Sequence, residues 1–137
     1  MFENGGLKIH LGEKAMQYDV QTRERTLKAI PQNVTQIVRK FASESRRILK
    51  DQLVAEYLFG SYATNTPTAL SDIDILIVVS GNAPELQWQM SGLASEYSLE
   101  YDVCISPILQ DIEVWKKNQR AHTLFYQEVT THGIPLC

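Results

Sequence analysis

The chain has 137 residues, of which 44% are hydrophobic and 21% charged, and its formal net charge is −3. These values are typical of one soluble globular domain, and the acidic balance gives no general electrostatic attraction to nucleic acids or anionic membranes. No apolar run approaches the ~18 residues of a membrane-spanning helix, and the N-terminus lacks a secretory signal pattern. The two cysteines, Cys104 and Cys137, fit neither a metal spacing nor a disulfide framework, so we expect a cytoplasmic protein.

Residues 1–30 precede the first clear helical pattern, and we interpret them as an N-terminal extension. Apolar residues alternate over 7–11, and a helix is expected from Asp19. The extension is interpreted either as a partner-binding segment or as a loosely ordered one. Residues 31–137 are expected to form the main domain. It opens with a helix after Pro31, where apolar residues recur at three- and four-residue spacings.

Two hydrophobic strands with a polar stretch between them follow this helix. The first strand is predicted over 54–59 and breaks at Gly60 and Ser61, and the second opens with Asp72 and Asp74. Because side chains two positions apart on a strand face the same way, the two aspartates share a face. Two carboxylates roughly 6.6 Å apart along one strand suit a divalent metal ion.

The second half of the chain is expected to continue with helix, strand and two helices. A helix is predicted over 84–97, with Trp88 near the edge of its apolar stripe and therefore interpreted as a core or rim residue. Residues 99–106 alternate between apolar and polar, which predicts a strand with Asp102 in its middle, ended by Pro107. The last two elements are expected to be helices, over residues 111–120 and 123–131.

If the strands that carry them are neighbours, Asp72, Asp74 and Asp102 converge beside Gly60 and Ser61. Like charges ~6–7 Å apart repel by about 2–3 kcal/mol at an effective dielectric constant near 20, and a divalent cation would remove this cost. Oxygen ligands of this kind suit magnesium. A glycine lets a phosphate approach the backbone, and a serine hydroxyl can bind it. Together these features predict a site for a nucleoside triphosphate.

The spacing of Gly60-Ser61, ten further residues and then Asp72-x-Asp74, with hydrophobic strands on both sides, resembles the DNA polymerase β-like nucleotidyltransferase superfamily. More narrowly, the chain is similar to the minimal nucleotidyltransferases, or MNT proteins, which act as antitoxins beside HEPN-family toxins. Asp102, in EYDVCIS, matches the third carboxylate of that family, and the ending TLFYQEVTTHGIPLC is similar to its last helix. The resemblance covers about residues 32–137.

The resemblance implies an α/β (α+β) fold, with a small mixed β-sheet backed by helices. It also implies Mg²⁺-dependent transfer of AMP from ATP to a tyrosine hydroxyl of a HEPN-family RNase toxin, in a hetero-oligomer with that toxin and without nucleic acid as a direct ligand. In that reaction Asp72, Asp74 and Asp102 would be catalytic and would bind the metal ions. Gly60 and Ser61 would bind the nucleotide phosphates.

Two other functions stay open. Residues 62–70 contain no Lys or Arg, although the family often carries a basic residue there, and this favours a catalytically silent antitoxin that neutralises its partner by binding. A small-molecule nucleotidyltransferase of the antibiotic-modifying kind would usually need an additional substrate domain, for which the chain lacks the length. The chain does not resemble the toxin itself, because Arg120 and His122 are only two positions apart.

Overall fold

The structure is a computed structural model that describes residues 30–64, 66–68 and 71–136. The alternation over 7–11 and the helix expected from Asp19 therefore lie outside the described residues. In chain order the elements are the helix α3 (Gln32–Leu49), the 3₁₀ turn η1 (Lys50–Gln52), the strand β1 (Leu53–Phe59), the 3₁₀ turn η2 (Gly60–Tyr62), the strand β2 (Ile73–Val79), the helix α4 (Ala83–Tyr101), the strand β3 (Ile105–Asp111), the helices α5 (Ile112–Ala121) and α6 (Leu124–His132), and the short strand β4 (Ile134–Pro135).

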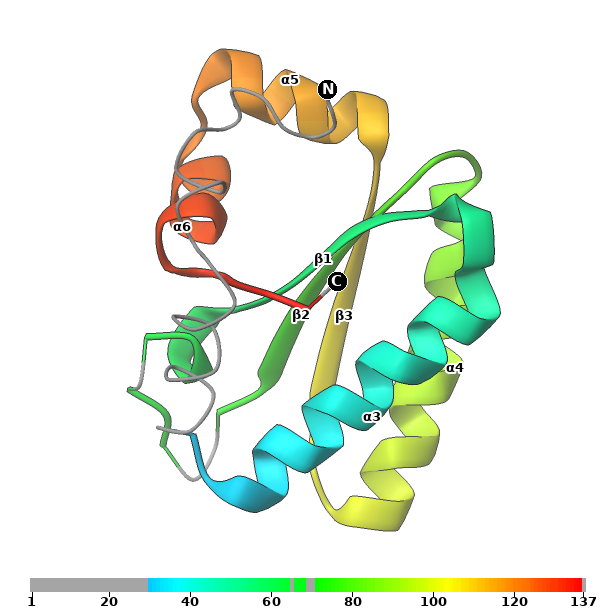
Figure 1. Cartoon of the computed structure of the whole chain (residues 1–137), viewed down its shortest axis with the longest axis vertical. Helices are drawn as coiled ribbons and strands as arrows, with labels where there is room; N and C mark the ends of the chain where they lie inside the picture. Colours follow the sequence, from blue (N-terminus) through cyan, green and yellow to red (C-terminus); the bar gives the residue numbers. More distant parts are fainter. Residues whose placement is uncertain (1–29, 65, 69–70, 137) are drawn as a thin grey trace.

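The four strands form one mixed sheet in the order β3-β2-β1-β4. Strand β1 is antiparallel to both β2 and β4, whereas β2 and β3 run parallel. Helices α3 and α4 cover one face of the sheet, and α5 and α6 lie on the other (Figure 1). This arrangement confirms the predicted small mixed sheet backed by helices.

Strand β2 is buried on both faces because each face of the sheet has its own hydrophobic core. Ile73, Ile75 and Ile77 belong to the core under α3 and α4, whereas Leu76 and Val78 pack with residues of α5 and α6. Side chains alternate along a strand, so the even-numbered positions of β2 face the α5 and α6 side. Asp74, near the start of this strand, therefore points toward that side.

Local sequence signals explain where most helices begin. Helix α3 starts directly after Pro31, a position that suits proline because the first turn needs no backbone donor. The side chain of Asp111 accepts a hydrogen bond of 2.8 Å from the backbone N–H of Glu113 at the start of α5. Thr123 caps α6 in the same way. The helices predicted over 111–120 and 123–131 are confirmed to within one residue at each end.

The strand predicted over 99–106 is wrong in its first half, because α4 continues to Tyr101 and β3 begins only at Ile105. Tyr97 holds this last helical turn in place, since its ring packs edge-on against both Phe41 and Tyr101 with ring centroids 5.4 Å apart. The predicted end at Pro107 is also wrong, because β3 passes through that residue. Proline is tolerated there because β3 lies at the edge of the sheet.

Trp88 does not lie in the core or at its rim, contrary to its interpretation from the sequence, because it is 81% exposed on α4. Over the described residues, no helix is both long enough and apolar enough to span a bilayer.

Candidate active site

The two predicted metal-binding aspartates lie at the beginning of β2, next to the end of β1. Asp72 directly precedes the strand and is exposed, whereas Asp74 lies within it and is half-buried. Because β1 and β2 are antiparallel, the start of β2 meets the end of β1, and Asp74 is paired with Phe59. The chain then turns at Gly60, so the aspartates and the Gly60-Ser61 turn lie side by side, as the sequence predicted.

Gly60 is required at this turn for two separate reasons. Its φ of +77° lies in the left-handed region, which side chains other than glycine rarely adopt. A Cβ atom at this position would also overlap with the carboxylate of Asp74. The absence of a side chain therefore lets the Asp74 carboxylate lie directly against the backbone of the turn.

A set of hydrogen bonds holds the turn in shape after Gly60. The carbonyl of Gly60 accepts bonds from the backbone N–H groups of Ala63 (3.1 Å) and Thr64 (3.2 Å). The carbonyl of Ser61 accepts one from the N–H of Thr66 (2.8 Å). These bonds fix the backbone of Ser61 directly after Gly60, the residue that lies against Asp74.

Burial and a neighbouring charge both act on the ionisation of Asp74. Burial raises the pKa of Asp74, and the negative charge of Asp72 raises it further. The Cys104 thiol forms a side-chain hydrogen bond with Asp72, which raises the pKa of the thiol, and the negative charges of both aspartates add to this effect. The site therefore carries concentrated negative charge that a cation would neutralise.

Asp102 is not placed as predicted. It follows the last residue of α4 and adopts a left-handed backbone conformation with φ of 56°, so it lies on the cap of the helix and not in the middle of a strand. It is exposed and lines an open pocket that also contains Ser71 and Cys104. No group of three His, Cys, Asp or Glu side chains that could hold a metal ion occurs among the described residues.

The structure therefore brings Asp72 and Asp74 together but does not gather Asp102 with them. Its predicted role as a third metal ligand stays a prediction. The positions that face the aspartates across the β2–β3 pair are different ones, because Asp74 is paired with Ser106 and Cys104 precedes that residue by two. Sequence reasoning missed Cys104 and Ser106, although their alternation in the segment 104–106 would have identified them once the register of β3 was known.

The donor set fits magnesium. Mg²⁺ is usually held by one or two carboxylates, and water and substrate phosphates complete its shell. Asp72 and Asp74 share one face. Burial and, after it, the negative charge of Asp72 raise the pKa of Asp74, and a cation bound there would offset both effects. Hard oxygen ligands select this class of ion over softer metals.

Comparison with known proteins shows to which family the chain belongs. The model of the family described as "Nucleotidyltransferase domain" matches residues 38–128. The Methanocaldococcus jannaschii protein named "Putative protein adenylyltransferase MJ0141" is 38% identical over 103 residues, which cover 74% of this chain and 96% of that protein. A second protein of that organism, "Putative protein adenylyltransferase MJ1305", is 31% identical over 77 residues, which cover 53% of this chain and 52% of that protein.

Two solved structures share the fold. A crystal structure of a mutant MntA-HpeT toxin-antitoxin complex superimposes with a TM-score of 0.51 at 22% identity, over 72% of each chain. A crystal structure of a toxin-antitoxin with AMP-PNP gives the same TM-score and coverage at 25% identity. The polymerase β-like fold and the paired aspartates beside the Gly60-Ser61 turn agree with the matched family model. This chain belongs to the nucleotidyltransferase domain family.

Proposed function

We propose that this chain is a magnesium-dependent protein adenylyltransferase of the cytoplasm that acts as an antitoxin. It transfers AMP from ATP to a tyrosine hydroxyl of a HEPN-family toxin. One observation carries the proposal: Asp72 and Asp74 share a face directly beside the Gly60-Ser61 turn, in a chain of the nucleotidyltransferase family. The similarity to a protein named as an adenylyltransferase and to toxin-antitoxin structures, one of them with AMP-PNP, supports it.

Each residue of the site has a distinct role in this proposal. Asp72 and Asp74 hold the cation, which when bound supplies positive charge against the triphosphate. The hydroxyl of Ser61 and the backbone at Gly60 hold the leaving phosphates. The Gly60 turn also keeps Asp74 in place, because only a residue without a side chain allows that contact.

The reaction follows from these roles. The acceptor oxygen forms a bond to the α-phosphorus of ATP, and the bond from that phosphorus to the bridging oxygen of the β-phosphate breaks. Pyrophosphate leaves with the electron pair, and the acceptor hydroxyl gives its proton to a base or to water. The sequence predicts Asp102 as this base and as a third ligand, but Asp102 lies on the cap of α4, so its role is tested separately with Asp102→Asn. The products are the adenylylated protein and pyrophosphate.

The test uses the full-length chain and the protein encoded by the adjacent gene. The two are incubated with ATP and magnesium, and the adjacent-gene protein is weighed by mass spectrometry. We expect a gain of one or more AMP units, lost in Asp72→Asn and in Asp74→Asn because either change removes a metal ligand. An unchanged mass after incubation with the wild-type chain would contradict the proposal.

A second candidate, a catalytically silent antitoxin, is favoured by one specific observation. Residues 62–70 contain no Lys or Arg that could hold the triphosphate charge. In that case the Asp72→Asn/Asp74→Asn double variant would still suppress toxicity in cells that express the toxin. Under the adenylyltransferase proposal the double variant loses protection.

A further inference from the structure

Helix α4 carries apolar residues on two opposite faces. Its inner face packs against the sheet through Leu86, Met90, Leu93, Ala94 and Tyr97. On its outer side Trp88 is 81% and Leu99 is 89% exposed. Eleven residues are about three helical turns, so these two side chains lie on one line, roughly 16 Å apart along the helix. Two large apolar side chains thus project into solvent from one face of a folded helix.

Small residues lie between Trp88 and Leu99 on this side of the helix. Gly92 and the exposed Ser95 lie on the same line as Trp88 and Leu99, because residues three and four apart share a helical face. A Cβ atom at Gly92 would meet nothing within 4 Å, so the space above it is open. We call these four residues the outer face of α4. Small residues between large ones allow the axis of a second helix to approach closely.

The neighbouring sheet edge is protected against strand addition. The side chain of Gln87 donates to the carbonyl of Pro107 (2.9 Å) and accepts from the N–H of Leu109 (3.0 Å). Pro107 itself has no N–H to offer. These features cover the free edge of β3. Natural proteins often protect exposed sheet edges in such ways. A partner that approaches this side therefore meets the outer face of α4 and not an open strand.

The charge around this face is acidic. Helix α4 contains Glu85, Glu96 and Glu100 and, over its 19 residues, no Lys or Arg. Lys40 of α3 reaches the end of the helix, where it donates to the Tyr101 hydroxyl (2.6 Å). A complementary surface is therefore both apolar and basic. A second copy of this chain would set acidic residues against each other, which disfavours it as the occupant.

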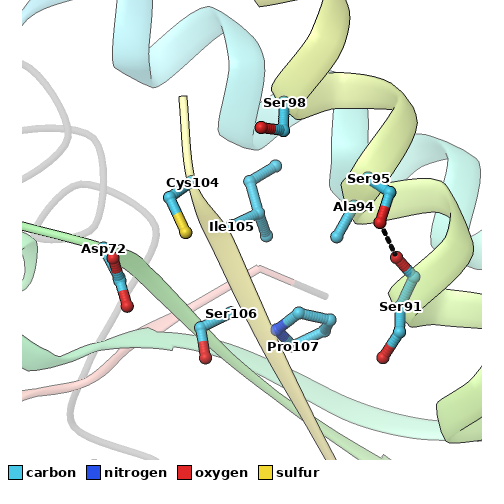
Figure 2. Close-up of a pocket in the computed structure, with 9 residues that line it drawn as sticks. All are labelled: Asp72, Ser91, Ala94, Ser95, Ser98, Cys104, Ile105, Ser106 and Pro107. Carbon is cyan, nitrogen blue, oxygen red and sulfur yellow. Dashed lines mark hydrogen bonds between the residues drawn. The ribbon is translucent and has the colours of Figure 1, made fainter. Parts of the chain in front are cut away.

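The outer face of α4 continues into the candidate active site. An open pocket of about 390 Å³ lies between α4 and β3 and is lined by Ser91, Ser95 and Ser98 from the helix. Figure 2 shows that Cys104 stands on the opposite wall and that the pocket extends to Asp72. Ser95 belongs to both surfaces. A protein bound on the outer face therefore lies next to a pocket that leads to Asp72.

We propose that the outer face of α4 is the docking surface for the protein that accepts AMP. The acceptor lays a basic amphipathic helix across Gly92 and Ser95, between Trp88 and Leu99, and this places its acceptor hydroxyl at the pocket that leads to Asp72. The inference rests on the proposed function for the identity of the acceptor. The surface itself rests on the exposure, shape and charge of α4.

The test measures the affinity of the full-length chain for the adjacent-gene protein by isothermal titration calorimetry. We expect Trp88→Ala/Leu99→Ala to weaken binding by about tenfold or more, because exposed aromatic and aliphatic anchors dominate such interfaces. Leu124→Ala is the matched control, since that leucine is 83% exposed on α6 and its loss should leave the affinity unchanged. Equal affinities of the double variant and the control would overturn the docking surface.

The charge is tested in the same assay. Glu96→Lys/Glu100→Lys should weaken binding and reduce its dependence on salt, whereas Glu128→Lys on α6 should not.

Two further measurements test whether something else occupies the outer face of α4. Sedimentation tests for a second copy of the chain, and hydrogen exchange tests for the chain's own residues 1–29. A wild-type dimer that Trp88→Ala/Leu99→Ala dissociates would assign the face to a second copy. Faster exchange in residues 1–29 of that variant, with unchanged partner affinity, would assign it to the chain's own extension. Either result overturns the proposal.

The two proposals can fail separately. If the wild-type complex forms and depends on Trp88 and Leu99 but no AMP is transferred, the docking surface stands and the adenylyltransferase function falls. If AMP is transferred and the double variant binds normally, only the docking surface falls. Stabilisation of the isolated chain by ATP and magnesium, measured by thermal unfolding, should persist in Trp88→Ala/Leu99→Ala and disappear in Asp72→Asn.

Discussion

Gly60 and Asp74 form the contact on which the geometry of the site depends. An alanine at residue 60 would have to adopt a φ of +77° with its Cβ in the space of the Asp74 carboxylate. We expect Gly60→Ala to lower AMP transfer by about 10–100-fold, the usual effect of displacing a ligand's support. The free energy of unfolding, measured with urea, should fall by about 1–3 kcal/mol because of the backbone strain.

Gly92→Ala is the matched control for the unfolding measurement, because Gly92 lies on the proposed docking surface and not at the aspartates. It replaces a glycine in the middle of α4 with open space around it, so it should raise the free energy of unfolding by about 0.5–1 kcal/mol and leave the aspartates undisturbed. Wild-type transfer by Gly60→Ala would show that the contact with Asp74 does not hold the metal ligand.

The burial of Glu56 makes the free energy of unfolding depend on pH. Its side chain is completely buried, and neither carboxylate oxygen has a hydrogen-bond partner within the described part of the chain. Burial raises the pKa of Glu56 from 4.5 to about 8, and this net value already includes the opposing effects of Ser45 and of the positive charge of Arg46. The unfolded chain therefore ionises at this residue near pH 4.5, well before the folded protein does. The contribution of Glu56 to stability is complete below that pH and is lost as the pH rises toward 8.

Glu56→Gln should remove this loss. We expect the free energy of unfolding of the wild type, relative to that of the variant, to fall by a few kcal/mol between about pH 4.5 and pH 8. Urea unfolding at a series of pH values measures the difference. Glu128→Gln, an exposed change on α6, should follow the wild type at every pH. Parallel curves for wild type and Glu56→Gln would mean that the buried carboxyl has a partner in solution.

Among the elements, the junction between α4 and β3 decides where the third carboxylate lies. Asp102 occupies the left-handed position that ends α4, and asparagine tolerates that conformation, so Asp102→Asn removes the charge and keeps the cap. We expect this variant to retain AMP transfer within about tenfold of wild type, whereas Asp72→Asn should lose more than about 100-fold. Kinetics at saturating magnesium measure both. A loss as large as that of Asp72→Asn would restore the three-carboxylate site predicted from the sequence.

The same junction shows why some elements could be predicted from the sequence and others could not. The segment over 99–106 alternates like a strand, but Tyr101 also continues the stripe of Tyr97 one helical turn later, and its contact with that ring favours the helix. Helix α3 and strands β1 and β2 could be predicted because their patterns are local and unambiguous. The shared face of Asp72 and Asp74 follows from strand geometry alone.

Across the whole molecule, the packing of the sheet leaves Asp74, near the beginning of β2, outside the two hydrophobic cores. One core lies under α3 and α4 and another under α5 and α6, and together they bury the rest of the strand. The parallel pairing of β2 with β3 brings Ser106 beside Asp74, and it could not be predicted because it joins segments more than thirty residues apart. The pattern of α4 does identify its buried stripe of Leu86, Met90, Leu93, Ala94 and Tyr97. The exposure of Trp88 could not be predicted, because large apolar residues also lie outside that stripe.

Transfer of the α-phosphate tests the account most directly. The adjacent-gene protein is incubated with the wild-type chain, magnesium and ATP labelled at either the α- or the γ-phosphate, and the label on the protein is counted. We predict that the α label becomes attached to the acceptor, that the γ label is released with pyrophosphate, and that Asp74→Asn transfers neither. Attachment of the γ label, or of no label by the wild-type chain, would contradict nucleotidyl transfer at the paired aspartates.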